Sequence, residues 1–331
     1  MDPPSEKSVH ALKRAAVRSA IMNHPAHAST IELSEGGLTV RIAADRGASI
    51  LSMSARSSLG VQTPVITRAV PGEDERLKPP CFVMAPWTNR VKDAAFEFKG
   101  KRHQLRASSA DGSAIHGDVR SRPFRILDRS PVSARLRFES VEHENVNFPW
   151  SFACEVRYEI EQRGRALRVD VAILNTDKAE FPCGCGLHPY FARFGASRKT
   201  SRVRISAGVG ARYPSRSNIP VGKAGADGLT RALRAGFFAG PPVDDVFAGF
   251  DGRGFITGES RVTISASPEH GHLVVYVPRN AMGDDEPFIA VEPVTMVNDG
   301  FNLFERGEQN TGVRVLKPGQ WLRTWTRFEV S

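Results

Sequence analysis

The sequence has 331 residues, of which 40% are hydrophobic and 24% are charged, and its formal net charge is +9 at pH 7. This composition is typical of a folded globular protein and argues against intrinsic disorder. No run of 18 or more apolar residues occurs, so the sequence predicts no membrane span. The basic residues are scattered, and no zinc-finger, RRM or helix–turn–helix pattern accompanies them, so we expect no nucleic-acid binding.

The cysteine count and the first residues bear on location and domain organisation. Four cysteines are too few for a disulfide scaffold in a chain of this length, so a reducing compartment is the default and we expect a cytoplasmic protein. Residues 1–29 lack the apolar core of a secretion signal and are expected to form an extension, either a short helix or a disordered segment. No linker or internal repeat divides residues 30–331, which are expected to form a single domain.

From residue 30 onward, apolar residues alternate with polar ones, and this period of two is typical of β-strands. Short turns rich in glycine, proline and polar residues separate the alternating runs. The predicted strands are, in chain order, 31–42 with a turn at Gly36-Gly37, 96–105 with a turn at Lys99-Gly100, 134–138, 152–175 with a turn at Arg163-Gly164, 262–266, 273–277 after a turn at Pro268–Gly271, and 313–328.

Almost no segment past residue 30 sustains a period of 3.6, so few and short helices are expected. The pattern predicts an all-β fold in which two large antiparallel sheets pack face to face as a β-sandwich. The proline- and glycine-rich region 209–243 is expected to be an extended loop, and long loops in compact domains are often functional.

His188 is the first candidate for chemistry, because it lies between a glycine-leucine pair and a proline in the stretch Gly186–Phe191. Gly186 permits unusual backbone angles, and Pro189 biases His188 toward an extended conformation. An imidazole exchanges protons near neutral pH, which suits a general acid or base. The alternative is a structural histidine whose ring is satisfied inside the core.

Glu292 is the second candidate, because it ends the apolar run 288–291 and precedes a proline. A carboxylate at the end of a buried strand is costly unless it is hydrogen-bonded or functional. Burial would raise its pKa, which is the direction that makes a better base. The alternative is an exposed glutamate on an edge strand.

Further polar residues could line a site with these two. His116 follows a polar loop, and Arg90 is a multi-donor cation that could bind sugar hydroxyls or a phosphate. Trp87 could stack on a pyranose, although a core position is the commoner fate of a tryptophan, and Asn89 lies between it and Arg90. Either Asp244 or its neighbour Asp245 could accept hydrogen bonds from vicinal hydroxyls.

Other chemistries have weaker support. Cys183, Cys185 and His188 lie close in sequence, and His270 and His272 share a strand face, but Cys-x-Cys is not a usual structural zinc spacing, so we predict no metal site. The phosphate-binding, dinucleotide-binding and nucleophile-elbow patterns are absent, which argues against an ATPase, a nicotinamide enzyme or an α/β-hydrolase.

The candidate residues lie in stretches that together resemble the aldose 1-epimerase (galactose mutarotase-like) family. The order and spacing of these stretches agree with the family from about residue 30 to the end of the chain. The stretches are Pro86-Trp87-Thr88-Asn89-Arg90-Val91, Ile115-His116-Gly117, Gly186-Leu187-His188-Pro189-Tyr190-Phe191, Val243-Asp244-Asp245-Val246-Phe247 and Val291-Glu292-Pro293-Val294-Thr295.

The resemblance implies a large antiparallel β-sandwich, the galactose mutarotase-like supersandwich, and interconversion of the anomers of a free aldose without a cofactor. It implies Glu292 as the general base, His188 as the general acid and His116 as a second active-site histidine. Arg90 and Asp244 match contacts to substrate hydroxyls. The expected partner is therefore a small-molecule sugar. The protein is expected to be a monomer or a homodimer.

Three rival functions remain open on the sequence alone. Additional arginine or lysine residues at the pocket rim would favour a hexose-6-phosphate epimerase of the same fold, and the basic chain allows this. A non-catalytic sugar-binding protein would bind a sugar without accelerating its interconversion. The third rival is a polysaccharide hydrolase or lyase, and a hydrolase usually has a pair of carboxylates, for which Glu292 and Asp244 are the candidates.

Overall fold

The computed structural model describes residues 30–57, 60–67, 78–193, 203–238, 242–258, 261–280 and 282–331. The prediction about residues 1–29 lies outside these residues. Within them, no helix is both long and apolar enough to cross a membrane.

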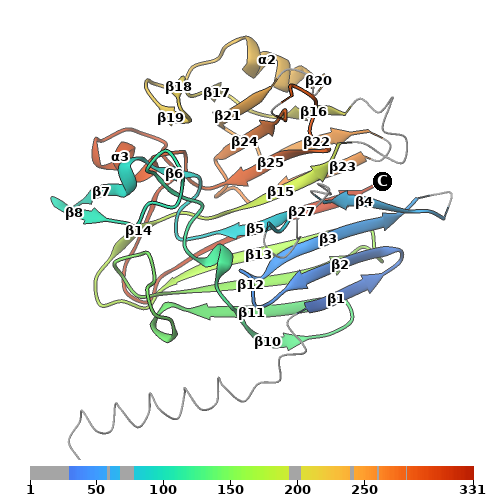
Figure 1. Ribbon diagram of the computed structural model, residues 1–331, viewed down its shortest axis with the longest axis horizontal. Helices are drawn as coiled ribbons and strands as arrows, with labels where there is room; N and C mark the ends of the chain where they lie inside the picture. Colours follow the sequence, from blue (N-terminus) through green and yellow to red (C-terminus); the bar gives the residue numbers. More distant parts are fainter. Residues whose placement is uncertain are drawn as a thin grey trace, which may run out of the picture.

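Two large sheets make up most of the fold, and neighbouring strands within them are antiparallel (Figure 1). The ten-stranded sheet contains, in spatial order, β1 (Thr30–Glu35), β2 (Leu38–Ala43), β3 (Ser49–Arg56), β4 (Gln62–Ile66), β15 (Gly186–Ala192), β25 (Phe288–Val294), β24 (His272–Val277), β21 (Val243–Ala248) and β17 (Ala211–Arg212), with β5 (Cys81–Met84) paired to β15 and β3. The nine-stranded sheet contains β10 (Arg125–Arg129), β11 (Ser133–Glu139), β12 (Phe152–Glu161), β13 (Ala166–Asn175), β27 (Trp321–Val330), β23 (Arg261–Ala266), β22 (Arg253–Thr257), β16 (Arg204–Ala207) and β20 (Phe237–Phe238).

Smaller elements surround the sheets. Figure 1 shows β6, β7, β8 and α3 gathered at one end of the molecule and α2 beside β17–β19 at another. The two-stranded sheets are β14 (Phe181–Cys183) with β26 (Arg314–Leu316), β18 (Ser215–Arg216) with β19 (Ile219–Pro220), β6 (Arg90–Val91) with β9 (Ala114–Ile115), and β7 (Ala95–Phe98) with β8 (Lys101–Gln104). Among the described residues, the helices are α2 (Gly228–Ala235) and α3 (Gly300–Glu305), with 3-10 turns η1 (Lys92–Ala94), η2 (Val119–Ser121) and η3 (Ser140–Glu142).

The predicted all-β sandwich and its hairpins are confirmed. β1 pairs with β2 around the predicted glycine turn, β7 with β8, and β12 with β13. Gly36 and Gly164 have φ angles of +57° and +81°, and a Cβ on either would meet the backbone of the other turn. The β1–β2 and β12–β13 turns, one from each sheet, therefore pack directly against each other.

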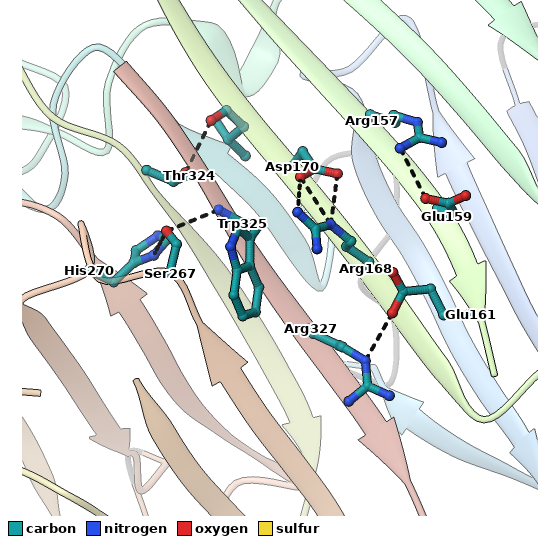
Figure 2. Close-up of polar contacts among 11 residues, drawn as sticks. Arg157, Glu159, Glu161, Arg168, Asp170, Ser267, His270, Thr324, Trp325 and Arg327 are labelled. Carbon is teal, nitrogen blue, oxygen red and sulfur yellow. Dashed lines mark hydrogen bonds and ion pairs between the residues drawn. The ribbon is translucent and has the colours of Figure 1, made fainter. Parts of the chain in front are cut away.

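Alternation along the strands creates the core between the sheets. In β12, Val156, Tyr158 and Ile160 are buried in the core, whereas the residues between them face outward. Figure 2 shows part of this outer face, where ion pairs join Arg157 to Glu159, Arg168 to Asp170 and Arg327 to Glu161. One face of the nine-stranded sheet is thus apolar and the other is charged, as the period of two predicts.

Two expectations need correction. The strands predicted at 262–266 and 273–277 exist as β23 and β24, but they belong to different sheets, so the turn between them carries the chain across the sandwich. The region 209–243 is not one extended loop, because it contains β17, β18, β19, α2 and β20. Asp227 caps α2 by accepting a hydrogen bond from the Thr230 amide, a local signal of the kind that sequence can reveal.

Tyr158 links the two sheets. Its ring lies in the core, and its hydroxyl donates a hydrogen bond to the carbonyl of Ala48, in the turn before β3. Removing the hydroxyl leaves a buried carbonyl without that donor, which costs about 1–3 kcal/mol. We therefore expect Tyr158→Phe to lower the free energy of unfolding by about that amount, measured by urea denaturation.

Tyr213→Phe is the matched control for this substitution. The Tyr213 ring is also buried, but its hydroxyl forms no hydrogen bond with the described residues. We expect little change in stability from it. Equal urea midpoints for the Tyr158 variant and the wild type would contradict a role for this hydrogen bond.

Candidate active site

The candidate catalytic residues lie on the face of the ten-stranded sheet that points away from the core. Along β15 and β25, Leu187 and Val291 enter the core between the sheets, whereas His188 and Glu292 point to the opposite face. A second apolar cluster covers part of that face and includes Phe82, Met84, Tyr213, Val246, Val274 and Val294. The same alternation that directs apolar side chains into the core therefore directs His188 and Glu292 to the face that carries the site.

Strand register brings His188 and Glu292 together. Gly186 pairs with Val294 and Tyr190 pairs with Ala290, so His188 lies opposite Glu292 on the adjacent antiparallel strand. His188 Nε2 is 3.2 Å from Glu292 Oε1. Both side chains are buried, with exposed fractions of 7% and 2%. A proton donor and a carboxylate thus meet in an environment that excludes most water.

The environment of Glu292 favours its protonated form. Burial raises the pKa of Glu292 well above its ordinary value of 4.5, and the negative charge of Asp244 raises it further. Glu292 Oε2 is buried and accepts no hydrogen bond from the described residues. A buried carboxylate oxygen without a donor is costly in a folded protein, and such groups are frequent at functional sites.

His116 joins the pair from a separate loop. Its ring packs edge-on against the His188 ring at 5.1 Å between centroids and lies 5.4 Å from the ring of Phe82. Burial lowers the pKa of His116 well below 6.5, and the charges of His188, Arg120 and Arg90 lower it further. His116 is therefore neutral at pH 7, with one ring nitrogen able to donate and the other able to accept.

The backbone around His116 is tightly constrained. His116 has a φ of +64°, and its amide donates to the carbonyl of Asn89 at 2.8 Å. Gly117 follows with a φ of +71°, and a Cβ there would lie 2.2 Å from the carbonyl oxygen of Ala85. A glycine is required at this position both by the left-handed backbone and by the close approach of the neighbouring chain.

Arg90 reaches the site from β6. Its Nε donates to Asp111 at 2.8 Å, and its Nη1 donates to Asn89 Oδ1 at 3.3 Å. Burial raises the pKa of Asp244 above its ordinary value, and the charge of Arg90 is among the causes that oppose this rise. Asn89 is buried and contacts both Arg90 and the loop of His116, so it is a candidate for positioning these two residues.

The alternation of β21 distinguishes the two adjacent aspartates. Asp244 lies two residues before Val246 on the strand, so its side chain points to the same face as Val246, which belongs to the apolar cluster on the site face. Asp244 also accepts a hydrogen bond from Asn218. The side chain of Asp245 points to the opposite face, where it forms an ion pair with Arg212 at 2.8 Å. Asp244 is thus the aspartate that faces the candidate site.

Trp87 does not contribute a surface to the site. Its side chain is fully buried in the core, stacks on Phe148, and donates from Nε1 to the carbonyl of Ala114. The expected stacking of Trp87 on a sugar ring is wrong, because no part of the ring is accessible. The core position, which the sequence left open as the alternative, is the observed one.

Comparison with known proteins shows the relationship directly. The family model described as aldose 1-epimerase matches residues 29–329. The chain belongs to the aldose 1-epimerase family. A galactose mutarotase-like protein from Clostridium acetobutylicum has a similar structure, with a TM-score of 0.76 and 20% identity over 91% of this chain and 95% of that one. The GalM/aldose epimerase homologue from C. elegans gives a TM-score of 0.75 with 15% identity, over 91% of this chain and 98% of that one.

Among curated proteins, the chain is similar to Uncharacterized protein YihR of Escherichia coli strain K12. The two are 28% identical over 109 residues, which are 33% of this chain and 34% of YihR. The matched stretch therefore spans about a third of the length of that relative. Family membership rests on the nearly complete match to the aldose 1-epimerase model and agrees with the supersandwich fold.

Several residues of this epimerase-family site had no clear signal in the sequence. Phe82 lies opposite His188 in the register of β5 and β15, with ring centroids 4.7 Å apart. Asn218, at the tip of the β18–β19 hairpin, donates to Asp244, and its carbonyl accepts from Asn298 Nδ2 at 2.9 Å. Strand pairing places Phe82 beside His188, and the β18–β19 hairpin places Asn218 beside Asp244. Local sequence specifies neither arrangement.

Of the residues considered for a metal site, His188 belongs to the catalytic pair, and the two cysteines and the other two histidines are buried outside that pair. Cys183 and Cys185 are buried in the core, and burial raises their thiol pKa values. His272 Nδ1 lies 3.1 Å from the carbonyl of Thr295, and His270 is buried near Ser267. Among the described residues, no three histidine, cysteine or acidic side chains are grouped so that they could hold a metal ion.

Gly117→Ala tests the backbone constraint at His116. The substitution combines a left-handed backbone, which costs about 1–2 kcal/mol for a residue with a Cβ, with a clash against the Ala85 carbonyl. We expect the free energy of unfolding to fall by more than about 2 kcal/mol. Gly100→Ala is the control, since Gly100 has the same φ of +71° with nothing within 4 Å. Equal losses in the two variants would mean that the close approach contributes nothing.

Proposed function

We propose that this protein interconverts the α and β anomers of an aldose by opening and closing the sugar ring. The observation that carries the proposal is the buried contact between His188 and Glu292, 3.2 Å apart on adjacent strands. Ring opening needs a base and an acid that act on two oxygens of one carbon, and this pair supplies both within a single small site. Membership of the aldose 1-epimerase family supports the same reaction.

In the proposed reaction, Glu292 removes the proton from the hydroxyl on C1 while His188 protonates the ring oxygen. The C1–O5 bond breaks, and its electron pair stays on O5, which becomes a hydroxyl. The electron pair of the former O1–H bond forms the carbonyl of the open-chain aldehyde. Rotation about C1–C2 presents the other face of the carbonyl, and closure returns both protons in reverse.

The separation of the pair constrains how a sugar binds. O1 and O5 share the carbon C1, so both oxygens fit into one gap between the two side chains. Hydrogen bonds of about 2.7–3.0 Å to each oxygen require the imidazole and the carboxylate to move apart from their present contact. The proton held between them is then available to the substrate, and Glu292 Oε2, which lacks a donor, can accept from a hydroxyl.

The surrounding residues have separate roles in this proposal. His116, neutral at pH 7, donates a hydrogen bond near the ring oxygen without adding a positive charge that would compete with His188. Arg90 and Asp244 bind hydroxyls on the ring and fix its orientation, which keeps C1 in register with the acid and the base. Orientation matters because a misplaced C1 would put one of its two oxygens out of reach of His188 or Glu292.

Glu292→Gln tests the general base. The amide keeps the shape of the side chain but cannot take the proton, so we expect kcat to fall by about 10²–10⁴-fold while sugar binding persists. The measurement is polarimetry of freshly dissolved α-anomers, corrected for the uncatalysed rate. Glu97→Gln, at an exposed strand position, is the control and should retain wild-type rates. A Glu292→Gln enzyme with wild-type kcat would remove Glu292 from the mechanism.

The pH dependence provides a second test. Because the pKa of Glu292 is raised above 4.5, its basic form is lost as the pH falls through that raised value. We expect the acidic limb of kcat/KM to lie above pH 4.5. Asp244→Asn removes a negative charge that raises the pKa of Glu292, so the limb should move to lower pH. Asp245→Asn, on the other face of β21, should leave the limb unmoved, and an unmoved limb in Asp244→Asn would contradict the assignment.

A further inference from the structure

The β18–β19 hairpin lies outside the two large sheets (Figure 1). The chain enters it alongside β21, because β17 pairs with β21 and the Tyr213 amide then donates to the Val246 carbonyl at 3.2 Å. At the tip of the hairpin, Asn218 Nδ2 donates to Asp244, two residues further along β21. The hairpin therefore ends on the aspartate that faces the site.

The two carboxylate oxygens of Asp244 differ in their surroundings. Asn218 donates to Oδ2, whereas Oδ1 accepts no hydrogen bond from the residues that the structure describes. Asp244 is open to solvent, although enough protein surrounds its carboxyl group to raise its pKa. A carboxylate held by one oxygen in this way presents the other oxygen in a defined direction, where a ligand hydroxyl can donate to it.

Asn298 holds the tip of the hairpin from below. It is 4% exposed, and its Nδ2 donates to the carbonyl of Asn218 at 2.9 Å. The next residue, Asp299, donates from its amide to the carbonyl of Arg90 at 2.7 Å. Asn298 thus joins the hairpin tip to the segment that carries Arg90, the other residue expected to bind sugar hydroxyls.

The amide of Asn298 is not explained by packing alone. Its Oδ1 is buried and accepts no hydrogen bond from the described residues. A buried polar atom without a partner is unfavourable, and an apolar side chain of the same shape would avoid that cost. The hydrogen bond to Asn218 is the one polar contact that this side chain makes within the described part of the chain. It therefore gives the asparagine a purpose that an apolar residue could not serve.

The turn geometry offers a second explanation for Asn218. Ser217 and Asn218 have φ angles of +49° and +62°, so both central residues of this two-residue turn are left-handed. Such turns favour asparagine and glycine whatever lies nearby. A role in the turn would be served equally well by glycine, whereas a hydrogen bond to Asp244 requires the side-chain amide. The substitution Asn218→Gly therefore separates the two explanations.

The polar groups around Asp244 come from several elements. They are Asn218 at the hairpin tip, Arg90 on β6, Asp245 on β21, Tyr276 on β24 and Glu292 on β25. Burial raises the pKa of Asp244 and the charge of Asp245 adds to this, whereas the hydrogen bond from Asn218 and the charge of Arg90 oppose the rise. Without Asn218, the carboxylate form that accepts a hydroxyl would be lost at a higher pH.

We propose that Asn218 and Asn298 are positioning residues of the epimerase site, in which Asn218 orients Asp244 toward a sugar hydroxyl and Asn298 holds Asn218 in place. This inference rests on the proposed epimerase function and adds two residues to it. Neither residue takes part in the proton transfers. Their contribution is to binding, because the free protein already holds Asp244 in the orientation that the sugar requires.

The first experiment is Asn218→Gly, which keeps the left-handed turn and the carbonyl that Asn298 binds and removes only the side-chain amide. KM is measured by polarimetry with freshly dissolved α-glucose and α-galactose. We expect it to rise by about 3- to 10-fold, since the sugar itself must then order Asp244, while kcat stays within about twofold. Ser217→Gly, at an exposed neighbour with a left-handed backbone, is the matched control and should leave both constants unchanged.

The pH dependence of KM distinguishes positioning from a general loss of structure. KM should rise as the pH falls through the pKa of Asp244, because a protonated carboxyl is a poorer acceptor. The hydrogen bond from Asn218 holds that pKa down, so in Asn218→Gly the rise in KM should begin at a higher pH than in the wild type. Ser217→Gly should follow the wild-type curve. Identical curves for all three proteins would contradict the role of Asn218.

Double substitutions test the chain of contacts. In Asp244→Ala no carboxylate remains to be held, so adding Asn218→Gly should change KM by less than about twofold. Asn298→Ala should raise KM by itself, and adding it to Asn218→Gly should give little further increase, because Asn298 acts through Asn218. Full additivity of either pair, in variants shown by thermal melting to be folded, would mean that the residues act independently.

The outcomes separate the two proposals. An active wild-type protein whose kinetic constants are unchanged in Asn218→Gly would overturn the positioning role and leave the epimerase function standing. A fall in kcat at unchanged KM would also overturn it, because an effect through Asp244 acts on binding. A folded wild-type protein that accelerates the interconversion of neither sugar would overturn the epimerase function and this inference with it.

Discussion

The site depends on one contact, the approach of a buried imidazole to a buried carboxylate across two adjacent antiparallel strands. His188 and Glu292 are opposite each other because β15 and β25 pair in one register, and a shift of either strand by one residue would turn its own catalytic side chain into the core. Pairing at both ends of the two strands, Gly186 with Val294 and residues 190–192 with 288–290, fixes that register. The sheet therefore performs the positioning that loops perform in many enzymes.

Around this contact, charge is distributed unevenly. Asp244 raises the pKa of Glu292 from one side, while Arg120 and Arg90 help to keep His116 neutral from another. In a partly desolvated site, such charges act more strongly than they would in water. The arrangement thus places a carboxyl group with a raised pKa close to a neutral histidine.

Much of the fold could be predicted from the sequence, because a period of two with glycine turns leaves few alternatives to antiparallel strands. The hairpins at 31–42, 96–105 and 152–175 all form where the pattern indicated them. The local pattern could not show that β23 and β24 lie in different sheets, since a short turn can either close a hairpin or cross the sandwich. Trp87 shows the same limit, because its position beside polar residues gave no information on whether its ring would pack in the core or line the site.

The sequence by itself determined the fold class, the family resemblance and the identity of the candidate acid and base, since these depend on residue type, alternation and order along the chain. Only the tertiary structure decided that His188 meets Glu292 directly, that Asp244 rather than Asp245 faces the site, and that Asn218 and Asn298 meet beside Asp244. The reason is physical: strand register and the packing of distant turns are set by hydrogen bonds and contacts between segments far apart in the chain, and no local pattern encodes those contacts.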